Sequence, residues 1–128
     1  MSILGHGIDI VEIARIDQML REHGERFLER CFTNEERGYC EEALARRAER
    51  YAARFAAKEA AFKALGTGWR SGIAWRDVGV VREPSGQPRL VITGRCVEIA
   101  RDMRIQDWRV SLSHAGGYAI ASVIACGG

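Results

Sequence analysis

The stretch RFAAKEAAFKALGTG, residues 54–68, constrains the fold more than any other part of the chain. It is rich in strong helix formers, and a glycine should end the helix. At about 100° per residue, aromatic residues and a leucine form one stripe and alanines cover the opposite side. A surface helix carries its charges opposite the apolar stripe. In this helix Arg54 and Lys58 fall inside the stripe, and Glu59 and Lys63 lie at its edge.

These four charges allow two interpretations. In the first, the basic side chains extend past the aromatics to water, and Glu59 and Lys63 form a weak surface pair. In the second, the helix is buried nearly all round, and its alanines pack closely against other backbone. Its charged edge then lines a cleft for an anion. The helix alone is equally consistent with both interpretations.

Size and composition indicate one domain, residues 1–128, with a formal net charge of +2. This charge is too small to indicate nucleic acid or a membrane as partner, and no apolar run is long enough to span a bilayer. The N-terminus lacks the basic region of a signal peptide. Four scattered cysteines without a CxxC pair are interpreted as reduced thiols, so we expect a cytoplasmic protein.

A change of hydrophobic period along the chain predicts an α+β domain. The first half should hold a strand and then helices: a strand over ILGHGIDIVEI, a helix over about 13–28, a helix capped by Thr33 and Glu36, and one or two helices over 41–66 with a possible break near 46–49. The second half should hold strands at 74–83 and 89–93 joined by PSGQP, a helix at 94–103, and strands at 108–114 and 118–125. Hairpin-linked strands predict a mostly antiparallel sheet packed with a long central helix.

Asp9 is the second unusual charge. It lies between Ile8 and Ile10 in an apolar strand, on the face opposite to theirs. An acid there is unfavourable unless it is paired or binds a metal. Gly5 and Gly7 leave room for a close neighbour. Capping of a turn or pairing with an arginine is the simpler explanation, and a metal site is the alternative.

The metal hypothesis joins Asp9 to the central helix. Two carboxylates, with water and phosphate oxygens, are the usual ligands of Mg²⁺. A lysine one turn from a metal carboxylate suits phosphoryl transfer, in which charge on the moving phosphate must be neutralised. Asp9, Glu59 and Lys63 could supply these parts if the fold brings them together.

Four further residues are weaker candidates. His114, at the end of a strand, and Arg46, before the main helix, could contact phosphates, but both are also typical of a solvated surface. Arg15 and Arg26 in the first helix could meet an acidic partner or belong to a mixed charged surface.

These features occur in the order and at the spacing of a known family. GIDIVEIARI, FTNEE, RFAAKEAAFKALGTG, SGQP and SLSHAGGYAIASVI resemble the bacterial holo-acyl-carrier-protein synthases, which are small 4′-phosphopantetheinyl transferases. The resemblance covers nearly the whole chain. It implies the fold of these transferases and an enzyme of fatty acid biosynthesis. Such an enzyme moves the phosphopantetheine arm of coenzyme A onto a serine of apo acyl carrier protein and releases adenosine 3′,5′-bisphosphate.

The resemblance also implies roles for the catalytic candidates. By similarity, Asp9 and Glu59 would hold Mg²⁺ on the coenzyme A pyrophosphate, and Lys63 would neutralise the phosphate under attack. The base that takes the proton of the carrier serine would be Glu59 or a water held by the metal.

Binding residues follow from the same resemblance. Arg54, Arg46 and His114 would lie near the coenzyme's phosphates. The family is typically a homotrimer with sites between subunits, so that His114 could come from a neighbour. The SGQP turn, with Gly86 and Pro88, would lie along the adenine. The first helix would receive the carrier protein, with Arg15 and Arg26 at basic positions.

Two departures and three alternatives accompany the resemblance. Ser85 and Gln87 stand where the family's turn often has asparagine and lysine, and the first helix is about one residue longer near 21–24. The alternatives are a non-catalytic binding module that keeps the fold, a basic module for nucleic acid, and the same transfer to a polyketide or peptide synthetase carrier.

Overall fold

The computed structural model describes residues 1–68, 70 and 72–128 and confirms the α+β class. The strands are β1 (Ser2–Glu12), β2 (Val78–Arg82), β3 (Pro88–Ile92), β4 (Asp107–Ala115) and β5 (Tyr118–Gly127). The α-helices are α1 (Ile13–Cys31), α2 (Asn34–Cys40), α3 (Arg47–Leu65) and α4 (Gly94–Asp102), and two 3₁₀ turns are η1 (Leu44–Arg46) and η2 (Trp75–Asp77).

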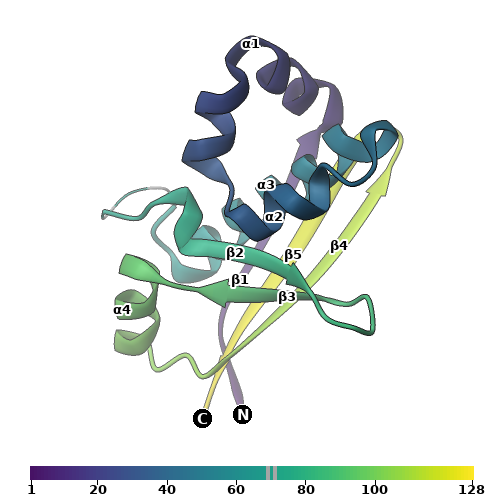
Figure 1. Ribbon diagram of the computed structural model, residues 1–128. Helices are drawn as coiled ribbons and strands as arrows, with labels where there is room; N and C mark the ends of the chain where they lie inside the picture. The colour runs from purple at the N-terminus through teal and green to yellow at the C-terminus, as the bar shows by residue number, and fades with distance from the viewer. Residues whose placement is uncertain (69, 71) are drawn as a thin grey trace.

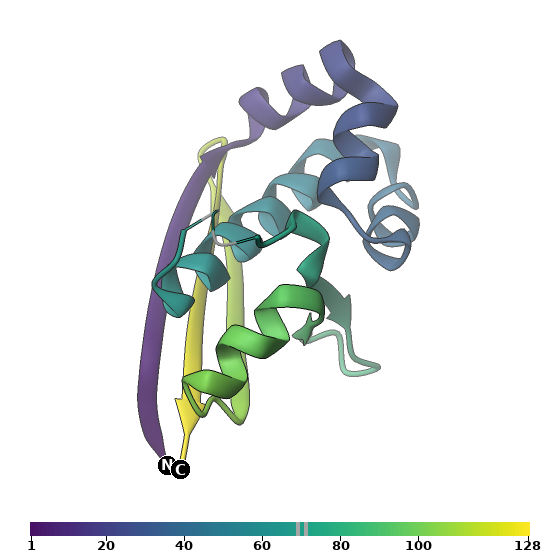
Figure 2. The ribbon, with the colours of Figure 1, turned by 90° about the vertical axis from the view of Figure 1, so that its left-hand side faces the viewer.

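The strands form two antiparallel sheets (Figure 1). In the larger sheet β5 lies between β1 and β4, and the smaller sheet is the β2–β3 hairpin. Figure 2 shows the helices and the hairpin on one side of the larger sheet, with α3 against it. The opposite face of this sheet therefore has no cover from the described part of the chain.

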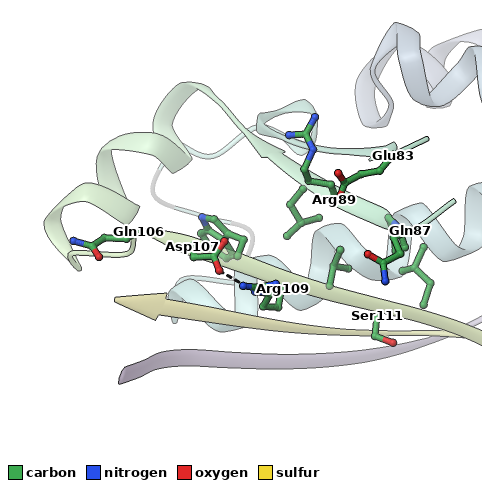
Figure 3. A pocket seen from close by; sticks show the side chains of 12 residues that line it. Glu83, Gln87, Arg89, Gln106, Asp107, Arg109 and Ser111 are labelled. Carbon is green, nitrogen blue, oxygen red and sulfur yellow. Dashed lines mark hydrogen bonds and ion pairs between the residues drawn. The ribbon is translucent and has the colours of Figure 1, made fainter. Parts of the chain in front are cut away.

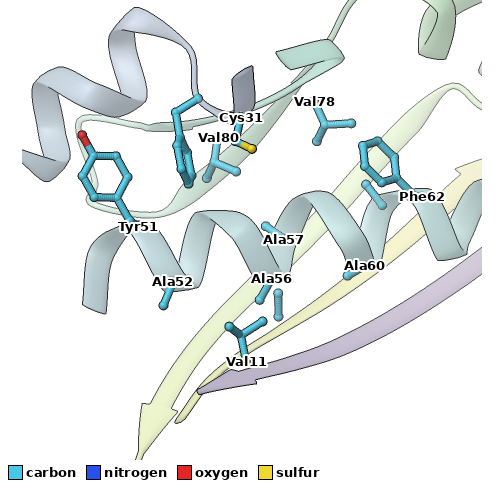
Figure 4. Close-up of a cluster of buried hydrophobic side chains, with 14 of the residues drawn as sticks. Val11, Cys31, Tyr51, Ala52, Ala56, Ala57, Ala60, Phe62, Val78 and Val80 are labelled. Atoms are coloured by element: carbon cyan, nitrogen blue, oxygen red, sulfur yellow. The ribbon is translucent and has the colours of Figure 1, made fainter. Parts of the chain in front are cut away.

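Helix α3 is buried nearly all round, which is the burial that the second interpretation of its charges requires. Alanines on one side of the helix face the large sheet, where Ala56 lies near Val11 of β1 (Figure 4). Its aromatic stripe packs under α1 and β2, where Tyr51 and Phe62 are fully buried. The small alanine side chains let the helix backbone come close to the strands.

The strand β1 comes closest to α3 at its two glycines, Gly5 and Gly7. A Cβ on Gly7 would lie 1.9 Å from the carbonyl oxygen of Ala60. A Cβ on Gly5 would lie 2.1 Å from that of Ala64. Only glycine fits at such contacts. The alternation of β1 then turns Asp9 toward α3 and leaves Ile8 on the uncovered face.

A fully buried ion pair joins α2, α3 and β2. The Nζ of Lys58 lies 2.7 Å from Oε1 of Glu36, and neither side chain is exposed to solvent. Lys58 also donates to the carbonyl of Val78, and Glu36 accepts from the backbone amides of Thr33 and Val80. Both charges are thus satisfied by several hydrogen bonds, which a buried pair requires. Lys58 is a structural residue and does not line a cleft.

Most predicted boundaries are confirmed, with two main differences. The capping box of Thr33 and Glu36 is present, and α3 ends at Gly66, whose φ is 77°. The strand predicted from residue 74 begins only at Val78, because Asp77 accepts from the amide of Ala74 and closes a 3₁₀ turn. Helix α1 runs three residues further than predicted and bends at Gly24, whose φ is 45°. The possible break near 46–49 is confirmed, since η1 divides segment 41–66 just before Arg47.

The thiols and the lengths of the helices are two further features of the fold. All four cysteines are free and buried. Burial raises the pKa of the Cys31 thiol to about 11, which keeps it unreactive. Among the residues that the structure describes, none of the helices has both the length and the apolarity that crossing a bilayer requires.

Gly7→Ala should lower the free energy of unfolding by about 1–3 kcal/mol or more, because the new methyl group must push β1 away from α3. Gly38→Ala is the matched control. Gly38 lies in α2 with open space around its Cβ position, so alanine should stabilise the protein by about 0.5–1 kcal/mol. Urea unfolding measures both. Equal effects of the two substitutions would contradict the close approach.

Candidate active site

The three predicted catalytic residues meet where β1 crosses α3. The Nζ of Lys63 lies 3.1 Å from Oδ1 of Asp9 and donates to the carbonyl of Ile8 at 2.9 Å. Glu59 lies one turn before Lys63 on α3, on the side of Asp9. The glycine contacts of β1 bring these groups together, although Asp9 and Lys63 are 54 residues apart in the sequence.

The carboxylate of Glu59 is partly buried and lies near the negative charge of Asp9. Burial raises its pKa above the ordinary value, the nearby charge of Asp9 raises it further, and Lys63 and Arg15 partly offset this. The second oxygen of Asp9, Oδ2, is buried and has no hydrogen-bond partner among the described residues. Two carboxylates with a free oxygen fit a divalent cation of the Mg²⁺ type, because hard oxygen ligands suit it and its charge would relieve their repulsion.

This pair supplies only part of a coordination shell. Among the described residues, no three histidine, cysteine or acidic side chains gather to hold a metal. A cation at Asp9 and Glu59 would therefore need oxygens from a substrate phosphate and from water, which is how Mg²⁺ is usually held in phosphoryl transfer.

A second group of predicted residues lines a separate pocket. Arg54, Gly86 and Pro88 enclose a hollow of about 200 Å³ together with Tyr39, Arg82 and Leu112. Arg54 is 4% exposed, and its Nε has no partner among the described residues. Burial lowers the pKa of its guanidinium, which nevertheless stays a cation. The pocket thus presents an incompletely satisfied positive charge.

Three arginine side chains lie around the ring of Tyr39, which lines this pocket. The guanidinium carbons of Arg50, Arg54 and Arg82 lie 4.0, 4.3 and 5.0 Å from the centre of its ring. Arg82 also donates to the Tyr39 hydroxyl. An aromatic ring can attract several cations to one place. Such a cluster is suited to a phosphate.

The remaining predicted phosphate ligands, His114 and Arg46, lie close in space to the first turn of α3. His114, near the end of β4, has its Nδ1 3.4 Å from Oε1 of Glu49. Arg46 precedes Glu49 by one helical turn and is exposed. The neighbouring Arg47 is engaged with Glu41 at 2.7 Å. Arg46 is therefore better placed than Arg47 to take a ligand.

The catalytic residues and the His114 group lie at opposite edges of the large sheet. Asp9 is on β1 and His114 is on β4, with β5 between them, which puts the strands roughly 10 Å apart. Glu49 and Glu59 are separated by ten residues of α3, about 15 Å along its axis. One copy of the chain does not bring the two groups together.

The two predicted carrier residues lie on α1. Arg15 is in its first turn, close enough to Glu59 to affect its pKa. Arg26 follows the bend at Gly24 and borders a hollow of about 320 Å³ that Met19 and Phe27 also line. The hollow combines an apolar floor with basic side chains. It could receive an apolar side chain flanked by acids.

An open cleft of about 710 Å³ lies between β3 and β4. Figure 3 shows part of its polar lining, where Gln87 of the hairpin faces Ser111 of β4 and Arg109 lies beside Asp107. Arg109 is held by Asp107 at 2.8 Å. The cleft contains neither Asp9 nor Glu59, so it does not belong to the carboxylate site.

Several contributing residues were not predicted from the sequence. Tyr39, Arg82 and Glu49 lie in separate segments that carry no motif of their own. The alternation of β2 could have suggested that Arg82 is exposed, but it could not have shown which ring it contacts. Glu36 was recognised as part of a capping box, but its second role as the partner of Lys58 depends on the tertiary fold.

Comparison with known proteins gives a consistent result. Residues 5–123 match the model of the 4′-phosphopantetheinyl transferase superfamily. The holo-[acyl-carrier-protein] synthase of Koribacter versatilis is 50% identical over 122 residues, which cover 95% of this chain and 97% of that protein.

Solved structures agree with the sequence match. The holo-[acyl-carrier-protein] synthase of Neisseria meningitidis has a TM-score of 0.87 at 31% identity and covers 97% of this chain and 98% of its own. That of Helicobacter pylori, in complex with coenzyme A, has a TM-score of 0.83 at 32% identity and covers 94% and 99%. The chain therefore belongs to the 4′-phosphopantetheinyl transferase superfamily, as a holo-[acyl-carrier-protein] synthase.

Proposed function

We propose that the protein transfers the 4′-phosphopantetheine group of coenzyme A to a serine of apo acyl carrier protein, with Mg²⁺ and with release of adenosine 3′,5′-bisphosphate. The observation that carries this proposal is the meeting of Asp9, Glu59 and Lys63 at the crossing of β1 and α3. The relatives named above are synthases of this type, which supports the same substrates here.

The residues have distinct tasks in this reaction. The serine oxygen forms a bond to the phosphorus next to pantetheine, and the bond from that phosphorus to the bridging oxygen of the pyrophosphate breaks. Asp9 and Glu59 would hold Mg²⁺, which neutralises pyrophosphate charge. The ammonium of Lys63 approaches the transferred phosphate and stabilises its developing charge. The serine proton would pass to Glu59 or to a water held by the metal.

The other end of coenzyme A would bind to the cationic groups. Arg54 and the Gly86–Pro88 turn enclose the pocket that we assign to the adenosine phosphate end. Arg46 and His114 would bind the remaining phosphate oxygens. Ser85 and Gln87 replace the family's usual residues in this turn, but Gly86 keeps the left-handed φ of 92° that shapes it.

The carrier protein would dock on α1. Carrier proteins of this kind are acidic, and Arg15 and Arg26 are exposed on that helix. Arg15 also lies near Glu59, so a carrier bound there would bring its serine toward the metal site. A fatty acid synthesis carrier in the cytoplasm is the proposed client.

A homotrimer would complete the site. The uncovered face of the large sheet exposes Ile3, Ile8 and Ile10 by 57–68% of their area, which is unusual for adjacent large apolar residues. Burial of this face between copies would remove it from water. It would also allow His114 of one copy to reach Asp9 of the next, since one chain keeps them at opposite edges.

Intact-mass analysis tests the transfer. The carrier should gain one phosphopantetheine when mixed with this protein, coenzyme A and Mg²⁺, and EDTA should prevent the gain. Glu59→Gln should slow transfer at least about 100-fold, because it removes a metal ligand and a base. Glu98→Gln is the control, since in the described structure Glu98 forms an exposed pair with its helix neighbour Arg95 on α4, far from the carboxylate site in the sequence. Full transfer by Glu59→Gln would refute the assigned site.

Glu59→Gln should also raise stability. The fold raises the pKa of Glu59, so the ionised carboxylate destabilises the folded state at every pH above that raised value. A neutral amide removes this penalty. The gain should be largest at pH values above the raised pKa and should decline as the pH falls through it, because Glu59 then becomes neutral in the folded state as well. Urea midpoints of the metal-free proteins over this range measure it, and a midpoint lowered at pH 8 would contradict it.

A mixing experiment tests the shared site. At a coenzyme A concentration well below the wild-type KM, Asp9→Asn and His114→Ala should each have little activity alone, the second because it loses a phosphate ligand. Unfolded together and refolded, equal amounts should regain about a quarter of the wild-type activity, because random assembly of a cyclic trimer forms that share of intact interfaces. Each variant refolded alone is the control. No recovery in the mixture, with trimers formed, would place both residues in one subunit's site.

A further inference from the structure

Glu49 has no role in the function proposed above, but it faces a residue that does. Its Oε1 lies 3.4 Å from Nδ1 of His114, and the imidazole is 58% exposed. A ring with so much exposed area is not held by packing. Among the described residues, this carboxylate is the only charged group recorded against the His114 ring.

A carboxylate at the position of Glu49 works against the binding of a phosphate. Arg46 lies one turn before it and Arg50 is the next residue, so it lies in a basic region of α3. The basic neighbours Arg47 and Arg50 already have carboxylate partners in Glu41 and Glu42. Glu49 is therefore not needed to balance them. A further negative charge would repel an incoming phosphate unless it improves the way another group binds it.

We propose that Glu49 is a positioning residue that orients the His114 imidazole for a phosphate of coenzyme A. The carboxylate accepts the Nδ1 proton, which fixes the ring orientation and turns Nε2 away from α3. With a phosphate oxygen at Nε2, both ring nitrogens donate, and the 3.4 Å contact tightens as the ligand binds. This inference rests on the proposed function, because it takes His114 as a ligand of the coenzyme.

A structural explanation of Glu49 makes a different prediction. Glu49 is the acidic residue in the first turn of α3, where a negative charge favours the helix dipole. Such a role would affect stability and would not depend on His114. Glu35, an exposed acid in the first turn of α2, has the same relation to its own helix and does not contact a histidine in the described structure.

The experiment combines kinetics with NMR of the imidazole nitrogens. Glu49→Ala should raise KM for coenzyme A about tenfold, the lower end of the loss seen when the carboxylate behind a metal-binding imidazole is removed, with kcat within about twofold. Glu49→Gln keeps an oxygen that can accept the Nδ1 proton, so it should recover most of this loss. Glu35→Ala should leave KM unchanged. In a His114→Ala background, Glu49→Ala should have no further effect.

The ¹⁵N shifts of His114, measured without substrate, should show a protonated Nδ1 in the wild type and a mixed state in Glu49→Ala. This measurement does not depend on transfer, so it separates failure of this inference from failure of the proposed function. Unchanged shifts and KM in Glu49→Ala, or a KM loss that is fully additive with His114→Ala, would overturn the inference. If Glu49→Ala does not fold, the wild-type ¹⁵N shifts and the KM of Glu49→Gln provide the test. A wild-type His114 whose Nδ1 carries no proton overturns the inference.

Discussion

The close contact between β1 and α3 is the constraint on which the rest of the structure depends. Gly5 and Gly7 bring the strand against the carbonyl oxygens of Ala64 and Ala60. The same contact sets the face of β1, so Asp9 turns inward while Ile8 and Ile10 turn outward. An acid that would be unfavourable in most apolar strands is thereby placed beside Lys63. One packing arrangement thus creates both the carboxylate site and the apolar face of the sheet.

The charges of α3 divide among three environments, which corrects the hypothesis of a single charged edge. Lys58 is fully buried against Glu36 and joins three elements. Arg54 is buried beside Tyr39 and reaches a different pocket. Only Glu59 and Lys63 approach β1. The ion pair of Lys58 fixes the rotation of α3 about its axis. Since Glu59 is the next residue, that rotation also determines where its carboxylate points.

The parts of the fold that depend on neighbouring residues could be predicted from the sequence. The capping box at Thr33, the end of α3 at Gly66 and the final hairpin depend on neighbouring residues, and the sequence predicts them well. The strand limits near 74–78 were missed because an aspartate side chain can close a turn within an apolar segment. Contacts across the fold, such as Glu49 with His114, have no local pattern. The catalytic candidates were identifiable since their types and spacing resemble a known family, whereas their meeting required the tertiary structure.

The separation of charges within one chain favours a site completed by a second copy. Carboxylates that suit a cation lie at the β1 edge, and the arginines and histidine that suit phosphates lie toward β4. In the proposed reaction coenzyme A would need both, because its pyrophosphate would meet a metal while its other phosphates would need cations. A single chain holds the two groups too far apart to act on one phosphate. The uncovered isoleucines lie on the strand that carries Asp9, so association through that face would bring the edge of one copy toward the cations of another. Assembly and catalysis would then depend on the same strand.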